Sequence, residues 1–310
     1  MSEKRCAVVV ILGAPNAGKS TLVNALVGEK VAIVTHKVQT TRAPLRGIAV
    51  RGETQLVLID TPGVFAPKRR LDRAMVRSAW AALDGADAIV HLVDAASYSK
   101  TLEAKAPAAD VRVREDVERI AAKLRDLGKK AILALNKVDA MPREALLAVT
   151  QDLAEGYGDV FMISALKSDG VEDLAAHLVK LAPEGPWLFP EDQIADAPAR
   201  VLASEVTREK LMLRLHEELP YETTVETEAW EERKDGSVKI DQTIFVARES
   251  QRKIAIGEKG QTVKAIGEAA RKELEANLGR RVHLFLHVKV RENWSEERAR
   301  YAALGLDFDA

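Results

Sequence analysis

Hydrophobic positions follow one pattern up to about residue 183 and a different pattern after residue 200. In the first part, stretches with a helical 3.6-residue period separate short aliphatic runs, which are typical of strands covered on both faces. The runs lie at 7–12, 55–60, 88–94, 131–136 and 159–164, and the helical stretches at 19–28, 73–83, 114–128 and 170–182. This alternation predicts an α/β domain with a mostly parallel sheet, helices on both faces, and ligands at the carboxyl ends of the strands.

The second part predicts a compact α+β unit in the order α-β-β-α-α-β. A helix at 203–219 precedes strands at 222–232 and 237–248, two helical segments around a glycine turn, and a last strand at 282–291. Residues 182–200 contain four prolines and follow neither period, so the junction is predicted there. We expect a surface loop insertion at 101–113, and domains at 1–183 and 201–310, the second including a C-terminal tail, joined by a linker at 184–200.

Composition refines this picture. The 310 residues are enough for two cores, and 47% apolar with 30% charged residues is an ordinary globular balance. The formal net charge is −1, so attraction to nucleic acid must come from a local patch. The single cysteine, Cys6, excludes an internal disulfide and a cysteine zinc site, which fits a cytoplasmic protein. No apolar run reaches the roughly 18 residues that predict a membrane-spanning helix.

The stretch GAPNAGKS (13–20) follows a predicted strand and begins a predicted helix. This is the setting of the Walker A phosphate loop, in which glycines let backbone N–H groups turn toward phosphates at a helix amino end. We expect Lys19 to reach the terminal phosphates and Ser20 to bind Mg²⁺. A chance glycine turn is the alternative. The predicted nucleotide-binding residues of the loop are Asn16, Ala17, Gly18, Lys19, Ser20 and Thr21.

Two motifs farther along the chain predict the base. NKVD (136–139) offers the Asp139 carboxylate to the N1–H and N2–H of guanine, a pair of donors that adenine lacks. SAL (164–166) offers the Ala165 N–H to the guanine oxygen. Both motifs follow predicted strands, and together they predict GTP as the nucleotide. The residues expected to bind it here are Asn136, Lys137, Asp139, Ser164, Ala165 and Leu166.

A GTPase also needs loops that respond to the third phosphate. DTPG (60–63) places Asp60 where a Walker B aspartate holds the metal, and leaves the Gly63 N–H to approach a γ-phosphate. In QTTR (39–42), Thr41 is favoured over Thr40 to close over Mg²⁺, with a loop that does not contact the metal as the alternative. The predicted catalytic residues are Lys19, Thr41 and Gly63, and the predicted metal ligands are Ser20, Thr41 and Asp60.

Unaided hydrolysis is expected to be slow. Ras-like enzymes place a glutamine directly after the DxxG motif to orient the attacking water, and the residue here is Val64, which cannot bind water. Help must then come from backbone groups, a partner or a monovalent cation. Asn16 is a candidate K⁺ ligand, and stiffening of the loop is the alternative role. His91 lies inside a predicted strand and is expected to be a core residue.

A second motif, Gly257-Glu258-Lys259-Gly260, lies between helical segments in the second part. KH modules use such a GxxG turn to clamp about four single-stranded nucleotides of RNA. From 248 to 291 the net charge is +6, and from 217 to 235 it is −6, so the loop lies in the basic stretch. Glu258 argues against RNA binding by this turn, because its negative charge would lie near the RNA phosphates. The predicted RNA-binding residues are Arg252, Lys253, Ile256, Gly257, Glu258, Lys259, Gly260 and Lys264.

With both parts in view, the chain resembles the Era family of bacterial ribosome-assembly GTPases, within the TrmE-Era-EngA-like GTPases. The resemblance covers about residues 7–306 and is carried by GAPNAGKSTLVNALVG, QTTR, DTPG, NKVD, SAL, FPEDQIAD, SEVTREKL, ELPY, IGEKG and VKVRENW. It implies a P-loop GTPase domain, a type II KH domain that binds the 3′ end of 16S rRNA, and a role in 30S maturation. It also implies that the protein is partly peripheral at the inner membrane. We expect a cytoplasmic monomer. The insertion at 101–113, Glu258 and the tail GLDFDA depart from the family.

Two other functions remain open from the sequence alone. The chain is an RNA-binding chaperone with a structural GTP site if its RNA affinity is the same with GTP and GDP. It is a metabolic phosphotransferase if it transfers phosphate to a small molecule, although NKVD and the lack of an evident acceptor site disfavour this. The slow GTPase switch is the leading prediction.

Overall fold

The computed structural model describes residues 4–37, 40–103, 108–216, 219–292 and 294–310. These residues form two compact units, which are described separately. The first comprises the chain up to Asp196 together with Leu304–Ala310, and the second comprises Ala197–Ala303. Residues 184–196, expected as linker, belong to the first unit, where Gln55 Nε2 donates to the Phe189 carbonyl and the backbones of Arg5 and Glu184 form an antiparallel β-bridge. The C-terminal tail, expected with the second domain, also belongs to the first unit.

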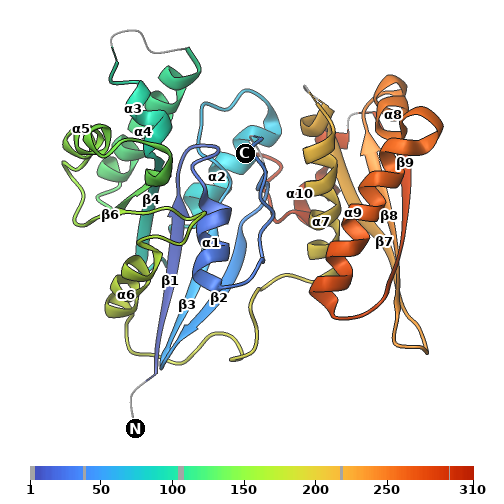
Figure 1. Ribbon diagram of the computed structural model, residues 1–310, viewed down its shortest axis with the longest axis horizontal. Helices are drawn as coiled ribbons and strands as arrows, with labels where there is room; N and C mark the ends of the chain where they lie inside the picture. Colours follow the sequence, from blue (N-terminus) through green and yellow to red (C-terminus); the bar gives the residue numbers. More distant parts are fainter. Residues whose placement is uncertain (1–3, 38–39, 104–107, 217–218, 293) are drawn as a thin grey trace. The chain divides into compact units, whose positions relative to one another are not determined.

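The first unit is built on a six-stranded sheet in the order β2-β3-β1-β4-β5-β6 (Figure 1). Pairing is parallel except between β2 and β3. The five strands predicted from aliphatic runs are present, whereas the antiparallel strand β2 was not predicted. The bounds are β1 Arg5–Leu12, β2 Leu45–Arg51, β3 Thr54–Asp60, β4 Ala88–Asp94, β5 Ile132–Asn136 and β6 Val160–Met162.

Helices cover both faces of this sheet. One apolar cluster joins α1 and α6 to one face, and two others join α2, α3, α4 and α5 to the opposite face. The predicted loop insertion at 101–113 was wrong for its second half, because α4 already begins at Ala108; residues 104–107 lie outside the described part. Helices α3 and α5 were not predicted. The bounds are α1 Lys19–Val27, α2 Arg70–Ala81, α3 Ala95–Lys100, α4 Ala108–Asp126, α5 Arg143–Leu153 and α6 Val171–Leu181.

Four neighbouring strands end at the same edge of the sheet. Register pairs Ile11 with Asp60 and Asp94 with Asn136, so the residues that follow β1, β3, β4 and β5 gather there. Because these strands are parallel, one edge collects their carboxyl ends and the loops that follow them. The phosphate loop, DTPG and NKVD are therefore brought together.

The second unit has the predicted order α-β-β-α-α-β, followed by a helix, α10, that was not predicted. Its sheet runs β7-β8-β9, with β7 antiparallel and β9 parallel to β8. Leu211, Ile244, Ile266 and Leu274 are among the buried residues that join α7 and α9 to this sheet. The bounds are α7 Ala199–Arg214, β7 Thr223–Glu232, β8 Val238–Val246, α8 Glu249–Ile256, α9 Gln261–Leu278, β9 Val282–Val290 and α10 Arg298–Ala303.

Candidate functional site

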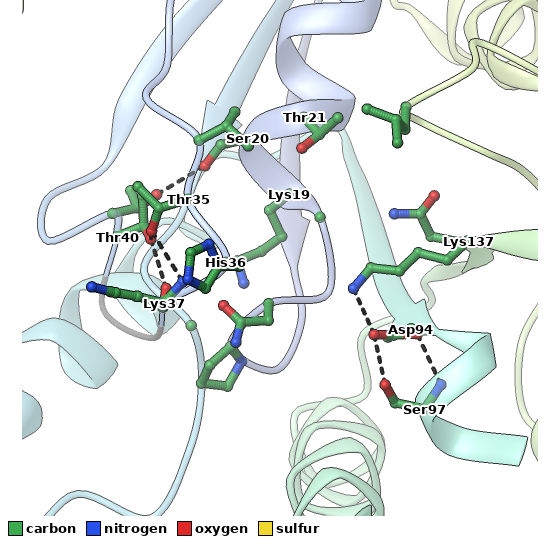
Figure 2. A pocket seen from close by; sticks show the side chains of 18 of the residues that line it. Lys19, Ser20, Thr21, Thr35, His36, Lys37, Thr40, Asp94, Ser97 and Lys137 are labelled. Carbon is green, nitrogen blue, oxygen red and sulfur yellow. Dashed lines mark hydrogen bonds and ion pairs between the residues drawn. The ribbon is translucent and has the colours of Figure 1, made fainter. Parts of the chain in front are cut away.

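The phosphate loop has a backbone that requires glycine at two positions. Gly18 has a φ of 99°, and a Cβ there would overlap Asn136 Nδ2. A Cβ at Gly13 would overlap the Leu92 carbonyl oxygen. Both residues let the chain turn tightly from β1 into α1, whose first residue is Lys19. The amino end of α1, which attracts anions, thus borders a cavity at the carboxyl ends of the strands (Figure 2).

Lys19 is held inside this loop. Lys19 is only 6% exposed. Its Nζ donates to the Gly13 carbonyl at 3.1 Å and to the Ala14 carbonyl at 2.9 Å. Burial lowers the pKa of Lys19 to about 8, and the nearby Asp60 carboxylate opposes that shift. The ammonium group thus lies where a phosphate would bind, and the Asp60 carboxylate offsets only part of the cost of burying its charge.

This burial predicts a pH dependence of GTP binding. The free protein loses the Lys19 charge as the pH rises through about 8, whereas bound triphosphate favours the charged form. Binding above pH 8 must then take up a proton, so the Kd for GTP should rise about tenfold between pH 7 and pH 9 and stay flat below pH 7. Equilibrium binding of a fluorescent GTP analogue measures this.

The matched control is Lys19→Arg, which keeps its charge over the whole range. It should bind GTP more weakly but without the rise between pH 7 and pH 9. An unchanged Kd over that range in the native chain would contradict the role given to the Lys19 charge.

Three oxygen-bearing side chains converge at the expected metal site. Ser20 Oγ donates to Asp60 Oδ2 at 2.7 Å, Thr41 Oγ1 donates to the same oxygen at 3.1 Å, and the two hydroxyl oxygens lie 3.0 Å apart. Burial raises the pKa of Asp60, and the hydrogen bond from Ser20 opposes this. Asp60 Oδ1 is buried and has no hydrogen-bond partner among the described residues. A set of hard oxygen donors with one unused carboxylate oxygen fits Mg²⁺. Thr41, rather than Thr40, has this position.

The base end of the cavity is organised by Asn136. This side chain is 2% exposed; its Nδ2 donates to the Ala17 carbonyl at 2.8 Å, and its Oδ1 accepts the Ala165 N–H at 2.9 Å. The Ala165 N–H, expected to face the guanine oxygen, is therefore engaged with Asn136 in this structure. Asn136 instead ties the phosphate loop to the SAL loop.

Asp139 and Lys137 lie beside Asn136 at the cavity. A hydrogen bond with Ser164 is the main cause that lowers the pKa of Asp139, so its carboxylate is charged near neutral pH. Lys137 Nζ pairs with Asp94 Oδ2 at 2.6 Å, and Asp94 Oδ1 accepts the Ser97 N–H at the start of α3 (Figure 2). Asp94 was not predicted, although it ends a strand just as Asp60 and Asn136 do.

A cavity of about 570 Å³ joins these parts. The predicted residues that line it come from the phosphate loop, from QTTR and DTPG, and from the base motifs NKVD and SAL. Three predicted residues, Ala17, Asp60 and Ala165, are buried behind the lining and are hydrogen-bonded to residues in it. The lining also includes residues outside the predicted site set, among them Thr35, His36, Lys37, Asp94 and Ser97. His91 is not part of it: the ring is fully buried, its Nδ1 lies 2.5 Å from the Tyr157 hydroxyl, and burial lowers its pKa to about 3.

The GxxG turn of the second unit has two different glycines. Gly257 has a φ of 76°, and a Cβ there would overlap Thr262, so glycine is required for the fold itself. Gly260 has a φ of 78°, but a Cβ there would meet no atom within 4 Å. Glu258 and Lys259 are exposed, and α9 begins directly after Gly260 with no side-chain cap. The turn thus presents open backbone and a helix amino end.

A shallow groove of about 280 Å³ lies between α9 and β9 and begins at Val263, three residues after the turn. Leu284 and Leu286 supply apolar surface on β9, and α9 contributes Lys264 and the small Gly267. Of the predicted RNA-binding residues, Lys264 lines the groove, Lys253 is exposed on α8, and Arg252 is partly engaged by Glu249 at 2.8 Å. Gly267, Arg271, Leu284 and Leu286 were missed as groove residues.

Salt bridges reduce the basic charge of this unit away from the turn. Lys289 pairs with Glu228 at 3.1 Å, and Arg280 pairs with Glu232. The acidic stretch of the sequence therefore neutralises part of the basic stretch within the fold. Exposed Lys253, Lys259 and Lys264 carry the positive charge beside the turn and groove.

Comparison with known proteins identifies both parts. The family described as 50S ribosome-binding GTPase matches residues 8–137, and the KH domain family matches residues 218–295. The GTPase Era of Caulobacter vibrioides is 60% identical over 310 residues, covering 99% of this chain and 98% of the relative. The GTPase Era of Maricaulis maris is 56% identical and 99% of each chain is covered. The chain belongs to the Era family of GTPases.

Solved Era structures have the same fold. One, of Era in complex with MgGDPNP and nucleotides 1506–1542 of 16S ribosomal RNA, has a TM-score of 0.87 at 35% identity, covering 97% of this chain and 99% of that one. Another, of an Aquifex aeolicus Era variant bound to GDP and AlF4⁻, has a TM-score of 0.86 at 36% identity with the same coverage. As an Era-family member, the chain is a GTPase that converts GTP to GDP and phosphate.

Two further observations concern Val64 and the helices. Val64 is fully buried and its N–H donates to the Gly13 carbonyl at 3.1 Å, so it offers no group to a water molecule at the phosphate. None of the helices in the described ranges combines the length and apolar character that crossing a bilayer requires.

Proposed function

We propose that this Era-family GTPase binds the 3′ end of 16S ribosomal RNA through its KH domain and assists maturation of the 30S subunit. Bound GTP permits the RNA contact, and slow hydrolysis ends it. The observation that carries the RNA half of the proposal is Gly260, whose Cβ position opens into free space beside an uncapped helix start. An RNA backbone can approach there as closely as KH recognition requires.

A relative supports the pairing of the two ligands. The Era that is 35% identical over almost the whole chain was solved with MgGDPNP and nucleotides 1506–1542 of 16S ribosomal RNA together. In this chain, the turn and the groove between α9 and β9 lie within the matched KH region. The phosphates would lie along the turn near Lys259, with bases on Leu284 and Leu286.

The GTP half of the proposal assigns roles to the chain's own residues. Lys19 binds the terminal phosphates, and Ser20, Thr41 and Asp60 hold Mg²⁺, which neutralises charge on the β- and γ-phosphate oxygens. Asp139 selects guanine, with Asn136 fixing the loops around it. The buried Val64 leaves the attacking water without a side-chain partner, so turnover is slow.

Three finer points complete the proposal. Asn16 lines the cavity with a φ of 62° and is assigned as a K⁺ ligand that assists hydrolysis. The protein acts as a monomer in the cytoplasm and contacts the 30S subunit during assembly. A fraction associates peripherally with the inner membrane. The family resemblance implies the last two points.

Titration of a fluorescent 16S 3′-end RNA against the Mg²⁺–GTP-analogue form tests the RNA half. Native protein should bind this RNA at least tenfold more tightly than a scrambled RNA of equal length. Gly260→Asp places charge and bulk where the backbone approaches, so it should lower RNA affinity by tenfold or more while GTP affinity stays within twofold.

Gly279→Asp, at the open end of α9, is the matched control, because its φ is 61° and its Cβ also meets no atom within 4 Å. It should keep RNA binding within threefold. Equal binding of the two RNAs, or no loss with Gly260→Asp, would contradict the proposal.

A further inference from the structure

Helix α2 carries a row of arginines directly downstream of the γ-phosphate-sensing loop. Arg70, Arg73 and Arg77 are three and four residues apart and so share one face of the helix. Six residues, 64–69, separate Gly63 from the helix start. Asp72 Oδ2 fixes that start by accepting the Lys68 and Arg69 N–H groups at 3.2 and 3.0 Å. The segment that follows the loop is thus hydrogen-bonded to the first turn of α2.

The C-terminal segment Leu304–Ala310 belongs to the first unit, and the chain ends beside α2 (Figure 1). Asp307 Oδ2 pairs with Arg77 Nη1 at 2.9 Å, the Phe308 ring centroid lies 4.4 Å from the Arg70 guanidinium, and the Ala310 carbonyl accepts from Arg73 Nε at 3.4 Å. Leu306 is 6% exposed. Each arginine of the row thus has its own partner in the segment, and a buried leucine anchors it.

We infer that Leu304–Ala310 is a latch that docks on the arginine row of α2 and favours the GTP-bound arrangement of the switch loops. In this structure the segment is docked and Thr41 is hydrogen-bonded to Ser20 and Asp60. This is the arrangement of Thr41 that the metal and the γ-phosphate favour. Because coupling is reciprocal, a segment that stabilises this arrangement raises affinity for GTP relative to GDP, and GTP tightens its docking.

The latch goes beyond RNA binding and does not depend on it. Helix α10 of the second unit ends at Ala303, so the latch starts at the next residue. A change in its docking therefore reaches that unit through the chain itself. The individual contacts are exposed and weak, but tethering gives them a high effective concentration.

The test measures the ratio of Kd values for Mg²⁺–GDP and a Mg²⁺-bound non-hydrolysable GTP analogue in the full chain, without RNA. Ending the chain after Ala303 should lower the preference for the GTP analogue at least threefold. Asp307→Arg and Arg77→Asp should each lower it at least twofold, because like charges then face each other. The double variant Arg77→Asp/Asp307→Arg restores opposite charges and should restore the preference.

Arg112→Asp, a charge reversal at an exposed position of α4, is the matched control and should leave the ratio unchanged. The charge-swap arm tests the latch even if the shortened chain is unstable. An unchanged ratio in the single variants, or a double variant no better than either single one, would overturn the inference. RNA binding is absent from the assay, so this result is independent of the rRNA proposal.

Discussion

Asp139→Ala is expected to lower the affinity for GTP by about 10³- to 10⁴-fold and to remove the preference for GTP over ATP. An aspartate is ionised near neutral pH, and the hydrogen bond with Ser164 lowers the pKa of Asp139 further. We propose that this carboxylate, which lines the cavity, accepts both guanine donors, whereas the phosphate-binding residues do not distinguish one base from another. Competition of GTP and ATP against a fluorescent nucleotide measures both quantities.

Asp84→Ala removes an exposed aspartate of the same unit and serves as the matched control, with GTP affinity expected within twofold of native. Native protein that binds ATP as tightly as GTP, or an Asp139→Ala variant that still prefers GTP, would contradict the assignment of the base site.

Gly63→Ala is expected to slow GTP hydrolysis by about 10²- to 10³-fold while GDP affinity stays within fivefold. A Cβ at this position would lie 2.9 Å from the Pro15 N and Cα atoms, which belong to the phosphate-loop backbone and cannot turn aside. The DTPG loop must then move away from the cavity and take the Gly63 N–H away from the γ-phosphate. Single-turnover phosphate release measures the rate, and equilibrium binding measures the GDP affinity.

Gly158→Ala is the matched glycine control, since a Cβ there meets no atom within 4 Å. Its hydrolysis rate should equal that of the native chain. A Gly63→Ala variant that hydrolyses GTP at the native rate would show that this loop does not take part in phosphate sensing.

Much of the site could be predicted because polar residues interrupt apolar strands at their carboxyl ends. Asp60 and Asn136 were found because they also stand in the motifs DTPG and NKVD, and the structure brings them to one edge of the sheet. Asp94 obeys the same rule and was overlooked, since it stands in no motif. The direction of the Ala165 N–H depends on the backbone of one loop, which residue types do not determine.

Other features needed information that the local sequence lacks. Strand β2 (LRGIAVR) contains a glycine and lies at the sheet edge, so it has no long aliphatic run. The alanine-rich start of α4 has high helix propensity, to which the loop prediction gave too little weight. The pairing of Arg77 with Asp307 joins residues 230 positions apart, and no periodicity reports such a contact.

The central claim is that the third phosphate in one domain controls RNA binding by the other. Its most direct measurement is the affinity of the full native chain for the 16S 3′-end RNA, with Mg²⁺ and either a non-hydrolysable GTP analogue or GDP. The account predicts at least tenfold tighter RNA binding in the GTP-analogue form, and by reciprocity an equal rise in GTP-analogue preference when RNA is present. RNA affinities that agree within twofold in the two forms would contradict it and would instead indicate an RNA chaperone with a structural GTP site.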